Sequence, residues 1–165
     1  MILDLKRIFA TVGATMPVSF TGDMSALDFA GTFPLKEPVK ADGTVSNEAG
    51  LVMLRLRIEY IYEAPCDRCG IQTKKSHTVV LERALATAIE GEESDTILTV
   101  PDMKLDVDEL VSTEVIVDLP TKHLCREDCK GICPKCGKDL NEGDCDCPKR
   151  EIDPRLSALA DLLKQ

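Results

Sequence analysis

The distribution of cysteine constrains this chain more than any other feature. Eight cysteines occur in 165 residues, and six of them lie within residues 125–147. Two segments, residues 66–70 and 133–137, have the pattern Cys-x2-Cys-Gly. Two thiolates at this spacing can bind one metal ion, and the glycine lets the backbone turn back over the sulfurs. We call each segment a knuckle, and the two together predict a metal-binding protein.

Thiolates at this spacing favour zinc, which takes four ligands in a tetrahedron. Eight cysteines suffice for one or two such ions, so Zn²⁺ is the expected cofactor. In the preferred grouping, one site consists of Cys133, Cys136, Cys145 and Cys147, and the other of Cys66, Cys69, Cys125 and Cys129. A grouping with Cys129 in place of Cys145 or Cys147 stays open, as does His123 in place of a thiolate.

The composition and the N-terminus indicate the compartment and the kind of core. Hydrophobic residues make up 44% of the chain and aromatic residues only 4%, which predicts an aliphatic core. No apolar run approaches the roughly 20 residues of a membrane span, and residues 1–7 lack the features of a signal peptide. We therefore expect a cytoplasmic protein whose thiols are reduced. The expected domains are a β-rich core, residues 1–120, and a cysteine-rich tail, residues 121–165.

The clearest secondary structure is a β-hairpin. Alternate residues are apolar in one segment, which predicts a half-buried strand: Val52, Leu54, Leu56, Ile58, Tyr60 and Tyr62. An earlier strand is expected from Lys36, and a later one from Gln72 to about Leu85, with Val79, Leu81 and His77 on one face. The first knuckle then lies in the loop of an antiparallel hairpin. These elements predict an α+β fold with an antiparallel β-sheet core and a few helices.

Other segments give weaker or local signals. Residues 1–14 fit a helix and a strand equally, and residues 16–33 fit short strands with a turn, or one short helix at residues 24–29. Asp106 is a good N-cap for a helix over residues 107–117, whose apolar face is predicted as Val107, Leu110, Val111 and Val115. Asp153 and Pro154 predict the start of a last, leucine-rich helix.

Residues 90–118 are strongly acidic. They contain ten carboxylates and one basic residue, Lys104, in a chain whose formal net charge is −9. This charge disfavours non-specific binding to a phosphate backbone. The segment is either a solvated surface or a docking surface for a basic partner.

No pattern in the sequence indicates catalysis, so we expect a protein that is not an enzyme. His77 and His123 are the only histidines, and neither belongs to an arrangement typical of nucleophilic catalysis. We interpret His77 as a structural or surface residue. A four-thiolate site has no open position for a substrate.

A combination of segments resembles a known family. Residues 66–69 read CDRC, residues 105–110 read LDVDEL, and residues 125–141 read CREDCKGICPKCGKDLN. Together with Leu119-Pro120 and Asp153-Pro154-Arg155, they resemble the cysteine-rich branch of the large ribosomal RNA subunit accumulation protein family, also called YceD. The resemblance implies a non-enzymatic role in the accumulation of large-subunit ribosomal RNA. It also implies a link to a large-subunit ribosomal protein, because the family is associated with one through neighbouring genes.

Three functions follow as hypotheses. The first is a ribosome assembly factor that binds a basic ribosomal protein or a pre-ribosomal particle, steered by the acidic segment. The second is a redox-sensitive zinc thiol switch. The third is direct RNA contact by the cysteine-rich segment. The charges of the basic and acidic residues in that segment nearly cancel, which weakens this hypothesis.

Overall fold

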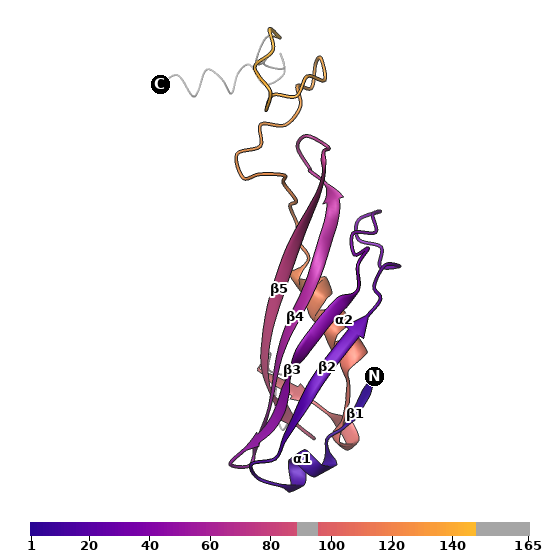
Figure 1. The fold of residues 1–165 in the computed structure, drawn as a ribbon, viewed down its shortest axis with the longest axis vertical. Helices are drawn as coiled ribbons and strands as arrows, with labels where there is room; N and C mark the ends of the chain where they lie inside the picture. The colour runs from indigo at the N-terminus through magenta and orange to yellow at the C-terminus, as the bar shows by residue number, and fades with distance from the viewer. Residues whose placement is uncertain (89–95, 148–165) are drawn as a thin grey trace, which may run out of the picture.

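A computed structural model describes residues 1–88 and 96–147 of the chain (Figure 1). A five-stranded sheet has the order β2-β3-β4-β5-β6, and a small two-stranded sheet pairs β1 with β7. The elements in chain order are β1 (Ile2–Asp4), α1 (Lys6–Ala10), β2 (Thr15–Gly22), β3 (Val39–Glu48), β4 (Leu51–Pro65), β5 (Gln72–Ala86), β6 (Ile97–Thr99), the 3₁₀ turn η1 (Pro101–Met103), β7 (Lys104–Asp106) and α2 (Val107–Asp118).

The predicted α+β fold is confirmed. Strands β2 to β5 form an antiparallel meander, and β6 adds a short parallel strand at the end of β5. The strands expected from about Lys36, over Val52–Tyr62 and from Gln72 correspond to β3, β4 and β5. Strands β6 and β7 were not expected, because three-residue strands are too short to show a period in the sequence.

The hydrophobic alternation in β4 determines which face of the sheet is buried. Even-numbered side chains from Val52 to Ala64 are buried, whereas Arg55, Arg57 and Glu59 are exposed. A shift of one residue in the pairing would reverse these faces and bury charge, so the alternation also fixes the register. Strand β3 continues through Asp42 and Gly43. Glycine is required at position 43 because a Cβ there would lie 1.9 Å from the Arg55 carbonyl oxygen.

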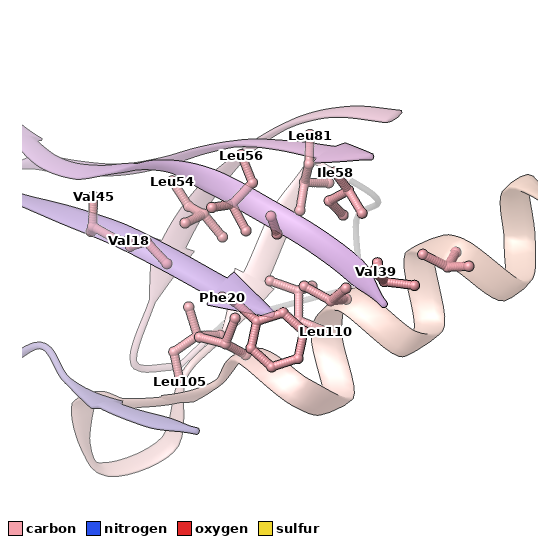
Figure 2. Close-up of a cluster of buried hydrophobic side chains, with 14 of the residues drawn as sticks. Val18, Phe20, Val39, Val45, Leu54, Leu56, Ile58, Leu81, Leu105 and Leu110 are labelled. Carbon is pink, nitrogen blue, oxygen red and sulfur yellow. The ribbon is translucent and has the colours of Figure 1, made fainter. Parts of the chain in front are cut away.

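Helix α2 covers the buried face of the sheet. The Asp106 side chain caps it by accepting hydrogen bonds from the backbone nitrogens of Asp108 and Glu109, as the sequence predicted. Its predicted apolar face is also confirmed, since Val107, Leu110, Val111 and Val115 are all buried. Figure 2 shows Leu110 beside Phe20 and Val39, so the helix and the strands share one aliphatic core.

The N-terminal region contains both a strand and a helix, the two structures that fitted the sequence of residues 1–14 equally. Strand β1 is followed directly by α1, whose Ile8 carbonyl accepts a 2.8 Å hydrogen bond from the buried Asn47 amide. The helix considered for residues 24–29 is wrong. The Asp23 carboxylate accepts a hydrogen bond from the Ser25 nitrogen, which gives the backbone a turn in place of a helix.

Two sequence predictions lie outside the described residues. They are the helix that begins at Asp153-Pro154 and the acidic stretch at residues 90–95. Among the helices at residues 1–88 and 96–147, none has the length and apolar character needed to cross a membrane.

Candidate metal centre

The first knuckle lies at the far end of a long hairpin. Strands β4 and β5 extend beyond β2 and β3, and residues 120–147 continue past the turn that joins them (Figure 1). The two strands of the hairpin stay paired as far as Pro65 and Gln72, so the knuckle that follows Pro65 begins directly at the paired end of the sheet. We call this end of the molecule, residues 66–71 together with 121–147, the tip.

The tip brings the eight cysteine sulfurs into two groups. Within each group all four sulfurs lie within 4.8 Å of one another. The first group consists of Cys66, Cys69, Cys125 and Cys129, and the second of Cys133, Cys136, Cys145 and Cys147. This is the grouping preferred from the sequence, and the alternative that moved Cys129 to the second group is not what the structure shows. The role of these cysteines as metal ligands stays a prediction.

The sulfur spacing fits a tetrahedral metal site. The distance between Cys66 Sγ and Cys129 Sγ is 3.8 Å, and that between Cys69 Sγ and Cys125 Sγ is 3.6 Å. Four sulfurs at about 2.3 Å from one ion would be separated by about 3.8 Å. A disulfide would need about 2.05 Å, and all eight cysteines are free. Both groups therefore could hold a metal ion of the kind that prefers thiolates.

The two knuckles have the same backbone geometry. In the first, the Cys66 nitrogen donates to the Ile71 carbonyl and the Gly70 nitrogen donates to the Cys66 carbonyl. In the second, the Cys133 nitrogen donates to Lys138 and the Gly137 nitrogen to Cys133. Gly70 and Gly137 have φ values of 73° and 75°, which side chains with a Cβ adopt at a cost. The sequence pattern thus encodes a local structure that presents two sulfurs on one side.

Backbone N–H groups stabilise one thiolate in each group. Burial opposes ionisation of Cys66, yet hydrogen bonds from the nitrogens of Cys125, Arg68 and Cys69 lower its pKa to about 6. The nitrogens of Cys136 and Lys135 likewise lower the pKa of Cys133 to about 6.

One other thiol in each group has a strongly raised pKa. Burial, followed by the neighbouring sulfur of Cys129, raises the pKa of Cys125 to about 12. The neighbouring Cys136, followed by burial, raises the pKa of Cys147 to about 12. Several thiolates cannot share one small volume without positive charge, which a divalent cation supplies.

His123 supports the first group without belonging to it. Its ring is buried against Tyr62, with a centroid distance of 4.8 Å, and its Nε2 shares a hydrogen bond with Thr73 Oγ1. The backbone nitrogen of His123 donates to the Asp67 carboxylate, and the backbone nitrogen of Asp67 donates to the His123 carbonyl. His123 is therefore not positioned as a replacement for a thiolate. Together these contacts align residues 123–125 with the first knuckle.

Two residues that the sequence did not single out contact Cys129, the last ligand of the first group. Arg68 Nη1 donates to the Cys129 carbonyl at 2.5 Å. Asn141 Nδ2 lies 3.5 Å from Cys129 Sγ, although Asn141 belongs to the loop of the second group. Neither residue is a ligand type for zinc, so the spacing of ligands in the sequence does not indicate them.

These features define a class of protein, an α+β domain whose long hairpin carries a double four-cysteine tip. The family model described as "Large ribosomal RNA subunit accumulation protein YceD" matches residues 54–163. The match covers more than half of the chain, from near the start of β4 through the cysteine-rich segment. The chain belongs to the YceD family.

Individual proteins that resemble this chain have low sequence identity to it, between 28% and 33% for the three described here. An uncharacterised protein of Mycobacterium tuberculosis is 29% identical over 134 residues, which cover 71% of this chain and 64% of the relative. The protein YlbN of Bacillus subtilis is 28% identical over 78% of this chain and 76% of its own length. The chloroplastic YCED homolog 1 of Arabidopsis thaliana is 33% identical over 39% of this chain and 21% of its length. The chain thus spans less than two thirds of the mycobacterial relative, and no solved structure matches it.

Proposed function

We propose that this protein supports the accumulation of large-subunit ribosomal RNA without acting as an enzyme, by binding a basic protein of the large subunit or of its precursor. The observation that carries the proposal is the family match over residues 54–163. That match includes α2 and both cysteine groups, so it covers both the partner surface and the tip.

The role proposed for the tip is structural, with one Zn²⁺ in each cysteine group. Four thiolate donors suit zinc, and a site whose four positions are all filled by protein has none left for a substrate. The metal supplies the positive charge that lets the thiolates coexist. The protein residues supply the rest, since the knuckle N–H groups orient the sulfurs and the hairpin fixes their position.

The surface proposed for the partner is the outer face of α2. Glu109, Thr113 and Ile116 follow one another at helical spacing and are exposed, and Val117 lies beside them. The exposed fractions of Ile116 and Val117 are 45% and 79%. Exposed apolar side chains among carboxylates suit a partner with basic and apolar residues, and the net charge of −9 would steer such a partner toward the protein.

Several other carboxylates of the acidic segment have structural roles. Asp106 caps α2, Glu114 pairs with Arg83, and Asp118 accepts a hydrogen bond from Tyr60. The docking surface is for this reason narrower than the whole acidic segment, and Glu109 is its best test position.

The charge of the tip favours a protein partner over RNA. Residues 121–147 contain five basic and six acidic residues. Each four-thiolate group with a divalent cation adds a formal charge of −2. A net negative surface repels a phosphate backbone, which RNA binding through this segment would have to overcome.

A charge-reversal experiment tests this function. Binding of purified large-subunit ribosomal proteins is measured at low and at high salt for the wild-type protein and for Glu109→Lys. Asp42→Lys is the matched control, because Asp42 is exposed on the opposite face of the sheet. We expect binding that weakens with salt and is reduced by Glu109→Lys alone. Binding that is independent of salt, or equal loss in both variants, would contradict the proposed surface.

The cellular role is tested in a strain depleted of the protein. We expect large-subunit ribosomal RNA to fall relative to small-subunit ribosomal RNA, with rescue by Asp42→Lys but not by Glu109→Lys. An unchanged ratio of the two RNAs after depletion would refute the function itself.

A redox switch is a second candidate because of one observation in the second group. Cys136 is exposed, whereas Cys133 is buried and Cys145 and Cys147 are half-buried. An exposed sulfur is the one that an oxidant reaches first. Mild peroxide should then release one metal ion per chain, and metal retention would exclude this candidate.

A further inference from the structure

We propose that the two four-cysteine groups bind metal cooperatively, with Asn141 as the positioning residue that couples them. The inference rests on the metal binding proposed above and concerns how the two sites depend on each other. The groups adjoin in the chain, since only residues 130–132 separate Cys129 of the first group from Cys133 of the second.

Asn141 links the loop of the second group to the last ligand of the first. Its Oδ1 accepts 2.8 Å hydrogen bonds from the Lys130 nitrogen and from Arg126 Nη2. Its Nδ2 is directed at Cys129 Sγ, at 3.5 Å, and also donates to Asp139 Oδ1 at 2.7 Å. One half-buried side chain thereby contacts three residues of the segment that ends the first group.

The backbone reinforces this junction. The Ile132 nitrogen donates to the Arg68 carbonyl at 3.2 Å, and the Leu140 nitrogen donates to the Gly131 carbonyl at 2.9 Å. Ile132 and Asp139 also form an antiparallel bridge. The loop of the second group is therefore docked on the first knuckle and on residues 129–131, and does not stand apart from them.

This arrangement makes each group sensitive to the state of the other. A hydrogen bond from an amide N–H to a thiolate is charge-assisted and stronger than one to a neutral thiol. An ion bound by the first group fixes Cys129 Sγ, which lies 3.5 Å from Asn141 Nδ2, and so favours the position of Asn141 and of its loop. When the four ligands of the second group are in place, they also order the loop that carries Asn141. Coupling of this kind is reciprocal, so each group raises the affinity of the other by the same factor.

The test is a titration with Zn²⁺ followed by native mass spectrometry, which counts chains with no, one or two ions. The affinity of each group alone is measured in Cys69→Ser/Cys125→Ser and in Cys136→Ser/Cys147→Ser. For the intact protein we expect the first ion to raise the affinity for the second about tenfold, the lower range of effects from residues outside the ligand set. The one-ion species should accordingly be depleted during the titration.

Two substitutions at Asn141 identify the residue responsible. Asn141→Leu removes all hydrogen bonds of the side chain, whereas Asn141→Asp keeps oxygen acceptors for Lys130 and Arg126 and loses the Nδ2 donor to Cys129 Sγ and to Asp139 Oδ1. Both should reduce the coupling factor, and any loss of affinity in the first group itself, whose Cys129 sulfur loses a hydrogen bond, is measured separately by placing each Asn141 substitution in Cys136→Ser/Cys147→Ser. Glu142→Gln, at an exposed neighbouring position, should leave the coupling intact.

The outcomes separate the coupling from the metal binding on which it depends. A protein that binds two ions independently overturns the coupling, and one that retains coupling in both Asn141 variants overturns the role of Asn141. Both results leave the proposed metal sites standing. A protein that binds no zinc at either group overturns both proposals together.

Discussion

Gly131 and Gly137 have nearly the same backbone conformation but different surroundings. Their φ values are 77° and 75°. A Cβ at Gly137 would meet no atom within 4 Å, whereas a Cβ at Gly131 would lie 2.8 Å from the Arg68 carbonyl oxygen. Gly131 is therefore required by close packing between the two groups as well as by its own conformation.

Alanine at each position separates these two requirements. Both substitutions place a Cβ in the left-handed region, which costs about 1–2 kcal/mol. Gly131→Ala also forces the Arg68 backbone to move, and we expect a further loss of about 1–3 kcal/mol, as for overpacked sites. The measurement is denaturant unfolding of both variants. Equal losses would show that residues 129–132 are not packed against Arg68 in solution.

At the scale of single residues, the sequence predicted the cysteines better than their supporting residues. Cysteine spacing is local, so both knuckles could be identified without a fold. Asn141, Arg68 and Gly131 act through contacts with residues distant in the chain or through another loop, and no spacing rule reports such contacts. The orientation of His123 was missed for the same reason, because Thr73 and Tyr62 determine it.

At the scale of elements, one hydrogen bond ties the end of α2 to the sheet. The Tyr60 hydroxyl donates to Asp118 Oδ2 at 2.7 Å, and Asp118 is the last residue of α2. The chain then leaves α2 toward the tip. This contact therefore sets the direction in which residues 119–125 approach the first knuckle.

Removal of that hydroxyl should have a measurable cost. We expect Tyr60→Phe to lower the free energy of unfolding by about 1 kcal/mol, the usual net value of a hydrogen bond. Tyr62→Phe is the control, because Tyr62 is equally buried but its hydroxyl bonds to none of the described residues. An equal effect of the two substitutions in denaturant unfolding would show that the Asp118 contact is not stabilising.

The same contact predicts a dependence on alkaline pH. Burial, together with the Asp118 carboxylate, raises the pKa of Tyr60 above its usual value. The folded protein thus holds the phenol proton more tightly than the unfolded chain, whose tyrosines titrate near pH about 10. Stability from this source is complete below that pH and is lost as pH rises above it. The loss between neutral and alkaline pH should be smaller in Tyr60→Phe; identical pH profiles would refute a role for this phenol.

The alternation in β4 and the cap of α2 were predicted because each depends on a few neighbouring residues. The sequence did not decide how β1, β7 and β6 pair, because their partners come from distant parts of the chain. It also offered a helix near Met24 that the Asp23 turn excludes. Short elements whose partners are distant are where prediction from a sequence fails.

At the scale of the whole molecule, the core and the tip are stabilised in different ways. The core is an aliphatic layer between the sheet and α2, as Figure 2 shows, and its cluster of buried side chains contains no cysteine. The tip has few buried apolar side chains of its own and is organised around the two sulfur groups. Metal removal should consequently loosen the tip while the core stays folded.

Hydrogen exchange before and after treatment with a chelator measures this difference. We expect amides of residues 123–140 to lose protection, and amides of the core half of β4, such as Leu54 and Leu56, to keep it. Restored protection on addition of Zn²⁺ is the control for damage by the chelator. Loss of protection throughout β4 would show that the core depends on the tip, which contradicts their separate stabilisation.

The most direct test of the central claim is the metal content of the purified protein and of two double variants. We predict two zinc ions per chain in the wild-type protein. We predict one ion in Cys66→Ser/Cys69→Ser, which disables the first group, and one in Cys133→Ser/Cys136→Ser, which disables the second. A wild-type protein without stoichiometric metal, or one that holds a single ion and loses it in both variants, would contradict two separate four-cysteine sites.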